Sequence, residues 1–564
     1  MPALFKSLAE LLEKVEATKK RIEIIEQTAN YLKTLDAEEI EPAVNMIVGR
    51  AFPKYSQKTI DVSWSTLTRI FERISTFNWD LFRQAMTSTG DIGQATKTIL
   101  ENSKPKKQTQ LTQTCLTITE VRRAFDAIAQ AQGSHARTKK ERLITTLMSQ
   151  ATPVEAKYLV KIFTGEMRTG LHEGLMEQAV AQAFDVPLQK VQHASMVLGD
   201  IGEVAATLKT QGSQALEMAG FTVFRPVKLM LAQTAQSTNE ALAKHGGKSS
   251  FEYKYDGARV QIHKQNGKVK IFSRRLSDVT ESLPEIVEIV EKNIYAQSII
   301  MEGEVISLDS AGLPIAFQHL MRRFKRIRDI GDMAQKIPLT LYLFDILYLN
   351  GESLIAKPYT ERRKILAQNI GEILLTIQMV TDQTAQAQDF LKEAIDAGHE
   401  GLMAKKPDSP YTPGRRGRRW LKIKTILEPL DLVITAAEYG YGRRKGWLSD
   451  YYLAARDAAT GEFLNVGKTF KGLTDAEIIE LTKRLKESAL NQDGHRVIVM
   501  PKIVVEVAYN EIQQSPRYKS QMALRFARIT RIRDDKAPEE ADTIARVREI
   551  YDRQFRNKGK YNSG

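Results

Sequence analysis

The spacing of apolar residues changes near residue 220, and this change constrains the fold more than any other feature of the sequence. Before it, apolar side chains recur at helical spacing, as at Phe5, Leu8 and Leu12. After it, short alternating or continuous apolar runs stand between Gly and Asp turns, which is typical of strands. The pattern predicts a helical region over residues 1–215, followed by strand-rich domains. A chain of 564 residues is long enough for three or more domains.

Residues 220–424 are predicted to form a mixed α/β domain. Its strand-like runs are YKYDGARVQIH, KVKIFSRR, SIIMEGEVI and LTLYLFDILYL. Helical stretches separate some of them, such as AQDFLKEAIDAG, which Gly398 closes. The domain is expected to end near WLKIK (420–424).

Residues 425–564 again indicate strands, in LDLVITAAEY, DYYLAARD, FLNVGKTF, KIVVEVAYNEI and ALRFARITRI. One helix interrupts them, and Thr474 and Glu477 form a capping box at its start. A small β-barrel with an inserted helix fits this pattern, and the oligonucleotide-binding (OB) barrel is the leading candidate.

Composition favours an anionic partner and excludes several kinds of site. Lys and Arg total 82 against 68 Asp and Glu, a surplus that suits a polyanion such as nucleic acid. Cys115 is the only cysteine, which excludes an intramolecular disulfide and a cysteine-based zinc site. No apolar run is long enough for a membrane span, and MPALFKSLAE is not a secretory signal. We therefore expect a cytoplasmic protein that makes no contact with a membrane.

Lys254, in EYKYDGAR, is the candidate nucleophile. A lysine in a short apolar strand is unusual, because an ammonium costs free energy to bury. Burial and nearby cations lower the pKa of a lysine, which makes the amine nucleophilic. Asp256 and Gly257 supply a tight turn, and Arg259 adds a fixed charge. The alternative is an edge-strand lysine that points to water beside an ordinary hairpin.

Further charged and aromatic residues follow Lys254 in a fixed order. Arginines close the next strand, carboxylates suited to magnesium end or begin later strands, and an aromatic side chain could stack on a base. Each also has an ordinary interpretation as a solvated strand end, a core aromatic or an exposed basic loop. The ordered set comprises Arg274 and Arg275, Glu302 and Glu304, Phe344 and Asp345, Glu400, Arg418, Lys422 and Lys424.

This order resembles the covalent nucleotidyltransferases, and specifically the ATP-dependent DNA ligases of archaeal and eukaryotic replicative type. KYDGAR is similar to the family's motif I, IMEGE to motif III, EGLMAKK to motif IV, WLKIK to motif V and LRFARITRIRDDK to motif VI. SRRLSDVT, LYLFDILYLNG and FRPVKLMLAQ resemble neighbouring segments, and residues 147–180 resemble part of the family's DNA-binding domain. The sequence departs from the family pattern at Leu229, Glu302 and Ala527, and none of these departures removes a catalytic group.

The resemblance implies an all-α DNA-binding domain (1–215), an α/β nucleotidyltransferase (adenylation) domain (220–424) and a C-terminal OB-fold domain (425–564). It implies an enzyme that seals nicks in duplex DNA through a lysine–AMP and a 5′-adenylated DNA, in DNA replication, repair and recombination. ATP is the substrate and Mg²⁺ the metal. The alternatives are an RNA ligase or an mRNA-capping guanylyltransferase, and a DNA-binding scaffold without activity.

The resemblance also implies a role for each candidate residue. Lys254 is the nucleophile, and Glu304 and Glu400 bind metal. Within the nucleotide site, Phe344 and Met403 would sandwich adenine, Glu252 would lie at its edge and Glu304 would hold the ribose. The residues implied to engage AMP, phosphate or pyrophosphate are Arg259, Arg274, Arg418, Lys422, Lys424, Arg533 and Lys536, with Arg531 and Asp535 beside them.

The implied partners are nicked duplex DNA and a sliding clamp, and the chain is expected to be a monomer. GSHARTKK (133–140) resembles a phosphate-contacting turn, although an exposed basic loop explains it nearly as well. KKQTQLTQ (106–113) is the expected clamp-binding place, but it lacks the paired aromatics of a good clamp-binding peptide. A lid motion of the C-terminal domain would need a hinge, which is expected between Thr425 and Asp431.

Overall fold

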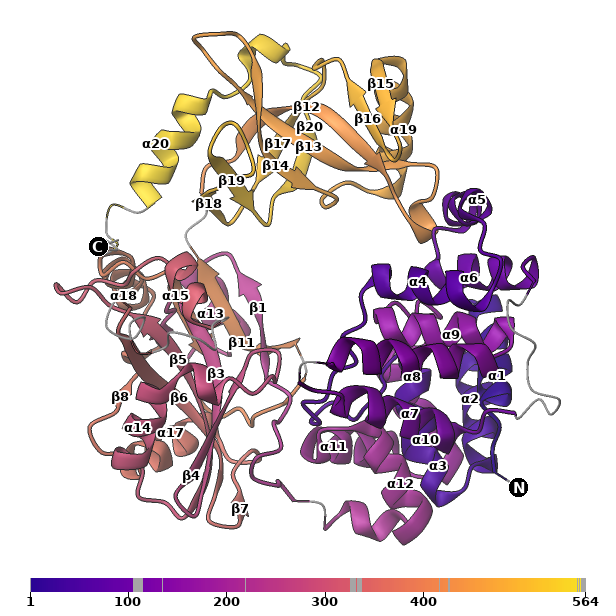
Figure 1. The fold of residues 1–564 in the computed structure, drawn as a ribbon. Helices are drawn as coiled ribbons and strands as arrows, with labels where there is room; N and C mark the ends of the chain where they lie inside the picture. The colour runs from indigo at the N-terminus through magenta and orange to yellow at the C-terminus, as the bar shows by residue number, and fades with distance from the viewer. Residues whose placement is uncertain are drawn as a thin grey trace.

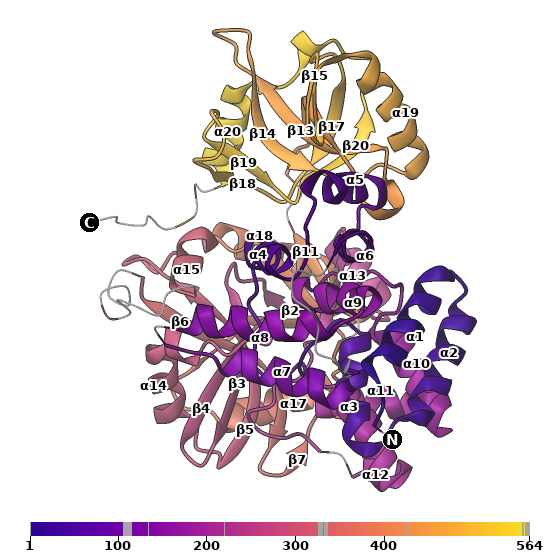
Figure 2. The same ribbon diagram turned by 45° about the vertical axis from the view of Figure 1, so that its right-hand side comes forward.

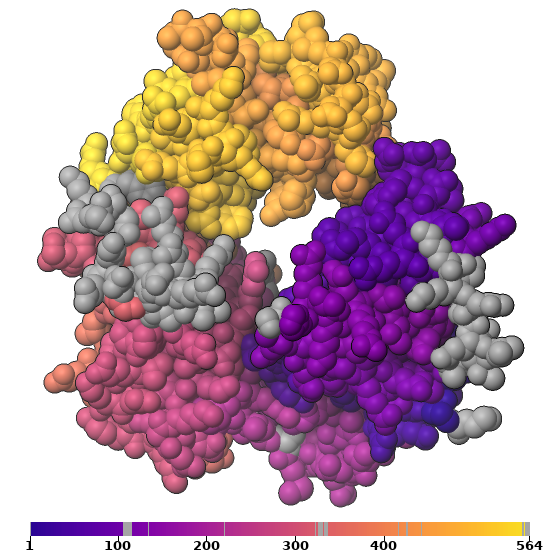
Figure 3. All heavy atoms as spheres, in the orientation of Figure 1, coloured from indigo at the N-terminus to yellow at the C-terminus, as the bar shows by residue number. Residues whose placement is uncertain are grey.

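The computed structural model describes residues 2–104, 115–133, 135–218, 220–324, 331, 337–414, 416–424, 427–554, 556 and 558. Three domains lie around a central opening (Figure 1), and the space-filling view in Figure 3 shows that side chains leave this opening free. They are a helical domain, a central domain with two sheets, and a C-terminal domain rich in strands, and the turned view in Figure 2 shows the same three parts.

The helical domain confirms the periodicity of the first 215 residues. Local signals set its helix ends, as in α9, where Thr152 and Glu155 form a capping box and Gly165, at φ 69°, terminates the helix. One large apolar cluster fills the interior of the domain. Its α-helices are α1 Phe5–Ala17, α2 Arg21–Thr34, α3 Ala37–Ile47, α4 Trp64–Ile74, α5 Trp79–Thr89, α6 Ile92–Glu101, α7 Ile118–Gln130, α8 Ala136–Gln150, α9 Pro153–Thr164, α10 Glu173–Phe184, α11 Leu188–Leu198 and α12 Ile201–Gln211.

The central domain has the expected α/β composition. All four strand-like runs named from the sequence contain strands, and the predicted helix before Gly398 is α18. The strands are β1 Leu231–Ala235, β2 Ser249–Tyr253, β3 Ala258–Gln265, β4 Lys268–Ser273, β5 Ser298–Ser307, β6 Leu339–Leu349, β7 Glu352–Ser353, β8 Leu374–Leu375, β9 Gln378–Thr381, β10 Gly401–Lys405 and β11 Arg416–Lys424. The α-helices are α13 Thr238–Lys244, α14 Pro284–Asn293, α15 Phe317–Arg323, α17 Tyr359–Gln368 and α18 Thr384–Asp396.

Two sheets form the centre of this domain. One has the order β1-β11-β10-β2-β9, and the other has the order β4-β3-β5-β6-β7, with β8 beside β6. Apolar side chains on one face of the first sheet pack against α13 and α18, and those on one face of the second pack against α14 and α17. Because side chains alternate along a strand, the next residues point to the opposite faces, where the candidate site residues lie.

The C-terminal domain is antiparallel and rich in strands, as expected, although the described strand pairs form no closed ring. KIVVEVAYNEI and ALRFARITRI each contain two strands rather than one, and Phe526, at φ 56°, separates the second pair. The helix begun by Thr474 is α19, whereas the terminal helix α20 was missed. The elements are β12 Leu430–Tyr439, β13 Leu448–Arg456, β14 Phe463–Thr469, α19 Asp475–Glu487, β15 Ala489–Asp493, β16 Arg496–Val499, β17 Val504–Ala508, β18 Glu511–Gln514, β19 Met522–Arg525, β20 Arg528–Ile532 and α20 Ile544–Gln554.

Specific polar contacts join the domains. The Gln57 side chain donates a hydrogen bond to Leu276 O (3.0 Å) and accepts one from Asp278 N (2.8 Å), which ties the helical domain to the loop after β4. Lys558, beyond α20, forms an ion pair with Asp256 of the central domain. The helices in the described part of the chain include none that is long and apolar enough to cross a membrane.

Candidate active site

The backbone of Lys254 is fixed at the end of β2. Its amide donates a hydrogen bond to Gly401 O (2.8 Å), and its carbonyl oxygen accepts one from the amide of Glu400 (3.0 Å). These bonds extend the β2–β10 ladder by one step. Gly401 lies at φ 137°, where a Cβ would stand 2.3 Å from Ile423 O, so glycine is required for β10 to lie this close to β11.

Three charged side chains meet at these strand ends. The carboxylate of Glu400 forms ion pairs with Lys254 and with Lys424, the latter at 2.7 Å. The register explains the meeting, because Gly401 pairs with Lys424 across the β10–β11 ladder. Residues 170 positions apart in sequence thus form one cluster around a single carboxylate.

The pKa of Lys254 differs from the sequence-based expectation. Burial alone would lower it, but the adjacent Glu400 carboxylate, helped by Glu304 and Asp256, outweighs burial and raises the pKa above its ordinary value. Burial also opposes ionisation of Glu400, yet Lys254 and Lys424 hold its pKa below the usual range. The prediction of a lowered lysine pKa is therefore wrong for this arrangement, in which Lys254 is held as an ammonium.

Further candidates lie on the same face of the five-stranded sheet. Met403 pairs in register with both Glu252 and Lys422, so these three side chains share a face. Lys254, which directly follows β2, and Lys424, the last residue of β11, stand two residues beyond Glu252 and Lys422 and project to that face as well.

The second sheet contributes Arg259, Glu302 and Glu304. The Arg259 guanidinium donates to Glu302 (2.8 Å) and to Met230 O (2.8 Å), so it is held by protein partners. Arg259 and Glu304 pair in register across β3 and β5. Burial raises the pKa of Glu304 to about 7 despite the neighbouring Lys254 and Arg259. Gly257 allows the turn before β3 to lie against β5, since a Cβ there would be 2.5 Å from Val305 O.

Phe344 lies between the two sheets beside a buried lysine that the sequence analysis did not single out. The ammonium of Lys405 lies 4.4 Å from the centre of the Phe344 ring and 4.6 Å from that of Trp420. Lys405 is 1% exposed, and its burial lowers its pKa. The alternation of side chains along β10 could have identified Lys405, because it stands two residues beyond Met403 and therefore faces the same side of the sheet.

The carboxylate of Glu252 is fully engaged by protein groups. It accepts hydrogen bonds from Lys405 (2.8 Å), Thr376 (3.0 Å) and the Tyr359 hydroxyl, and it is 2% exposed. Its partners lie on β10, on α17 and before β9, so sequence spacing gave no indication of them. Glu252 thus lies at the floor of the candidate site with its orientation fixed.

Some predicted site residues do not join this cluster. Arg274 and Arg418 are exposed, and within the described residues neither side chain makes an ion pair. Arg533 and Lys536 lie in the C-terminal domain, where both form ion pairs with Asp431. The segment 106–113, expected to bind a clamp, lies outside the described residues. In GSHARTKK (133–140), Arg137 lies in α8 and forms an ion pair with Glu141.

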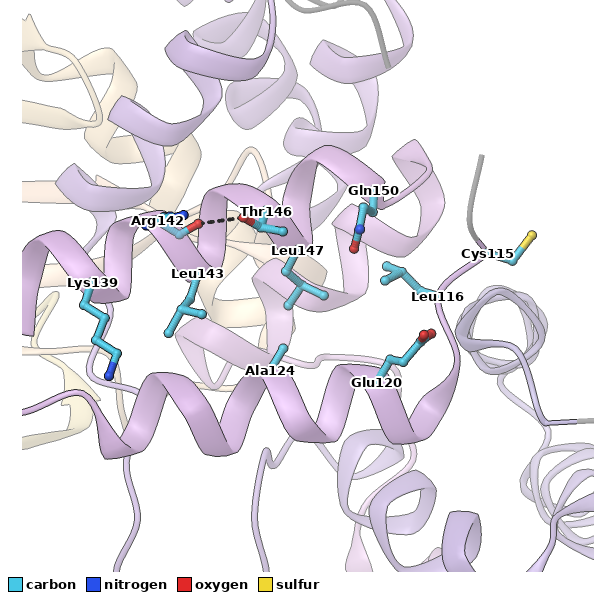
Figure 4. A pocket seen from close by; sticks show the side chains of 10 residues that line it. All are labelled: Cys115, Leu116, Glu120, Ala124, Lys139, Arg142, Leu143, Thr146, Leu147 and Gln150. Carbon is cyan, nitrogen blue, oxygen red and sulfur yellow. Dashed lines mark hydrogen bonds between the residues drawn. The ribbon is translucent and has the colours of Figure 1, made fainter. Parts of the chain in front are cut away.

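A separate groove opens in the helical domain, between α7 and α8 (Figure 4). Apolar side chains line it together with charged ones of both signs, and none of the predicted site residues is among them. Its lining residues are Cys115, Leu116, Glu120, Ala124, Lys139, Arg142, Leu143, Thr146, Leu147 and Gln150. The chemistry-bearing residues therefore gather in the central domain and not in this groove.

Family models match most of the chain. Residues 4–181 match the DNA ligase N terminus, residues 229–424 the ATP dependent DNA ligase domain, and residues 444–536 the ATP dependent DNA ligase C terminal region. The candidate cluster around Lys254 lies within the second of these matches.

Similar proteins span the same length. A "DNA ligase 1" of Korarchaeum cryptofilum (strain OPF8) is 45% identical over 555 residues, which cover 98% of this chain and 99% of that protein. A "DNA ligase" of Thermococcus fumicolans is 41% identical over 559 residues, covering 99% of this chain and 100% of that protein. A solved structure named "Pmar-Lig_PreS3" has a TM-score of 0.59 at 19% identity, covering 93% of this chain and 99% of that one, and shows a similar fold.

Proposed function

Because the chain belongs to the ATP-dependent DNA ligase family, we propose that it seals nicks in duplex DNA through an AMP carried on Lys254. The observation that supports this assignment is the cluster of Lys254, Glu400 and Lys424 at adjoining strand ends. A lysine amine held beside a carboxylate that also binds a second cation suits attack on a phosphate.

The proposed reaction has three phosphoryl transfers. The Lys254 amine, after losing a proton, attacks the α-phosphorus of ATP, and pyrophosphate leaves. The AMP then passes to the 5′-phosphate at the nick, which frees the lysine. Finally the 3′-hydroxyl attacks the activated phosphate, loses its proton, joins the strand and releases AMP. Each step moves negative charge on phosphate, so catalysis depends mainly on positioning and charge neutralisation.

Nucleotide contacts follow from the facing sheets. Phe344 and Met403 would hold the adenine, with Glu252 below its edge, and Glu304 would lie near the ribose. Lys422 and Lys424 would meet the α-phosphate, together with Arg259. Arg274 and Arg418, both exposed, would contact phosphate after loops or DNA bring it to them.

Magnesium fits Glu400 and Glu304, because carboxylate oxygens are its preferred ligands. Within the described residues no group of three His, Cys, Asp or Glu side chains could hold a metal, so phosphate and water oxygens would complete the shell. When bound, the ion neutralises charge on the phosphates. Glu400→Ala should therefore lower activity sharply and raise the metal concentration needed for half-maximal rate.

Labelled ATP tests the assignment directly. The wild-type chain should retain label after denaturing electrophoresis, whereas Lys254→Ala and Lys254→Arg should not, since a guanidinium stays protonated and cannot attack. Lys248→Ala removes an exposed lysine from the same region and serves as the matched control. Label surviving in Lys254→Ala would refute the proposal. A DNA nick, an RNA nick and an uncapped RNA end, offered side by side, separate DNA sealing from RNA ligation and capping.

The proposal includes nicked DNA as the partner in replication, repair and recombination, with the chain acting as a monomer. A sliding clamp is a second proposed partner, bound through residues 106–113. A clamp pull-down that compares the wild type with Gln108→Ala and Leu111→Ala tests it, and equal retention of all three would remove the clamp from the proposal.

A further inference from the structure

Asp431 binds both cations that are proposed to act on pyrophosphate. The Arg533 guanidinium donates through Nη1 to Asp431 at 3.0 and 3.1 Å, and the Lys536 ammonium lies 2.6 Å from Asp431 Oδ2. Both cations therefore meet at one carboxylate, and a single oxygen of that carboxylate contacts both of them.

The remaining nitrogens of Arg533 are also engaged. Nε and Nη2 donate to Asp535 at 2.9 and 2.7 Å. The carboxylates of Asp431 and Asp535 thus bind two edges of the planar guanidinium, which fixes its orientation. Among the described residues Lys536 has one carboxylate partner, Asp431, and its side chain is 30% exposed, so its ammonium remains accessible from solvent.

This cluster belongs entirely to the C-terminal domain. Asp431 of β12 pairs in register with Glu506 of β17, which pairs in turn with Arg531 of β20. Asp431 and Asp542 also exchange two hydrogen bonds: Asp542 N donates to Asp431 O at 2.8 Å, and Asp431 N donates to Asp542 Oδ2 at 2.8 Å. The Asp431 cluster is therefore built within the C-terminal domain alone.

The start of this strand is anchored as well. Glu428 forms ion pairs with Arg546 and Arg553 of α20. Residues 428 and 431, at the far end of the hinge expected between Thr425 and Asp431, thus both contact the C-terminal domain. Thr425 and Ile426 lie outside the described residues.

We propose that Asp431 is a positioning residue for the first step of the reaction. It holds Arg533 and Lys536 on one carboxylate, so that both cations can meet a group with several anionic oxygens, such as the departing pyrophosphate. Without the carboxylate, two like charges this close would repel and separate. The proposal rests on the proposed function, and Asp431 itself takes no proton and forms no covalent bond.

The experiment compares two steps in the full-length protein. Asp431→Asn keeps the side-chain size but removes the charge. We expect lysine–AMP formation at saturating ATP to slow roughly 10- to 100-fold, as for other misplaced catalytic groups. Sealing of a nick that already carries 5′-AMP should stay within about twofold, because no pyrophosphate leaves in that step. Asp431→Glu should restore part of the lost rate, since it returns the charge.

The matched control is Asp534→Asn. Asp534 lies in the same segment and pairs with Arg484 at 2.6 Å, but its side chain is 67% exposed and contacts neither cation. This variant should behave as the wild type in both assays. Retained sealing of adenylated DNA also shows that Asp431→Asn is folded.

Three results would overturn the inference: unchanged lysine–AMP formation in Asp431→Asn, faster formation, or equal losses in the two assays. Faster formation would mean that Asp431 restrains the cations, and equal losses would mean that it only supports folding. None of these three results would contradict the assignment of Lys254 as the nucleophile. Failure of the proposed function itself is recognised separately, by label that remains on Lys254→Ala.

Discussion

Lys254 and Glu400 are joined twice, because their side chains form an ion pair and the Glu400 amide donates a 3.0 Å hydrogen bond to the Lys254 carbonyl oxygen. The backbone contact fixes the distance between the two residues, and the side-chain contact fixes the charge state. A nucleophilic amine must lose its proton, yet here the adjacent carboxylate favours the ammonium. Deprotonation of Lys254 in this arrangement must therefore overcome the attraction of Glu400, to which Glu304 and Asp256 add.

The pH dependence of lysine–AMP formation should report this pairing. The raised pKa of Lys254 means that the reactive amine accumulates only as pH rises through that value. Glu400→Gln removes the anion, so the pKa should fall and the acidic limb of the profile should move down by roughly one to three pH units. Glu400→Asp keeps the charge and is the control. The measurement is single-turnover labelling at saturating ATP and Mg²⁺, and an unmoved limb in Glu400→Gln would contradict the pairing.

The free energy of unfolding should fall as pH rises, because Glu304 is buried. Burial raises its folded-state pKa from 4.5 to about 7, so between these values the folded state binds more protons than the unfolded state and loses stability as pH rises. The effect is at most about 3.5 kcal/mol, because the pKa differs by about 2.5 between the two states and each pKa unit corresponds to about 1.4 kcal/mol. Glu304→Gln should lack this loss and be the more stable protein above neutral pH.

Urea denaturation at an acidic and a slightly alkaline pH checks the effect. Glu480→Gln, which changes an exposed glutamate on α19, is the control and should follow the wild type at both values. If the free energies of unfolding of Glu304→Gln and the wild type differ by the same amount at both pH values, the Glu304 carboxyl does not titrate as described.

The ion pair of Arg362 with Asp345 should be essential to the central domain. Both side chains are fully buried, with Arg362 Nε 2.7 Å from Asp345 Oδ1. Arg362→Met leaves a buried carboxylate without its partner and should cost about 3–5 kcal/mol in the free energy of unfolding. The double variant Arg362→Met with Asp345→Asn removes both charges and should recover part of that loss. A double variant no more stable than Arg362→Met would show that packing, and not charge, dominates there.

The helical domain should supply DNA affinity and not chemistry. A truncated chain that begins at Phe221 retains every residue of the Lys254 cluster and should still form lysine–AMP. It should bind and seal nicks poorly, and binding by the full chain should weaken steeply with salt through counterion release. Gel-shift titrations at several salt concentrations measure this, and full nick affinity in the truncated chain would disprove it.

Local pattern predicted most of the fold, because periodicity reports which face of an element is buried. The terminal helix α20 was missed although Ile544, Val547 and Ile550 are buried at helical spacing, since three apolar residues are a weak signal among many charges. Phe526 divided an expected strand because its positive φ cannot be read from a phenylalanine.

Sequence reasoning was less complete for the candidate site. It placed Lys254, Glu400 and Lys424 in one group, and the structure brings them together. It gave the wrong direction for the lysine pKa because that depends on a carboxylate 146 positions away. It also overlooked Lys405, whose aromatic neighbours come from separate strands and a helix.

The two hydrogen bonds of Gln57 couple the helical domain mechanically to the central domain. Its side-chain amide spans Leu276 O and Asp278 N, so the loop that carries Arg274 follows the helical domain for as long as both bonds hold. Any outward displacement of that domain must break them or drag the loop along. An outward displacement of the helical domain would therefore pull on the segment of Arg274 through Gln57, a side chain that carries no charge.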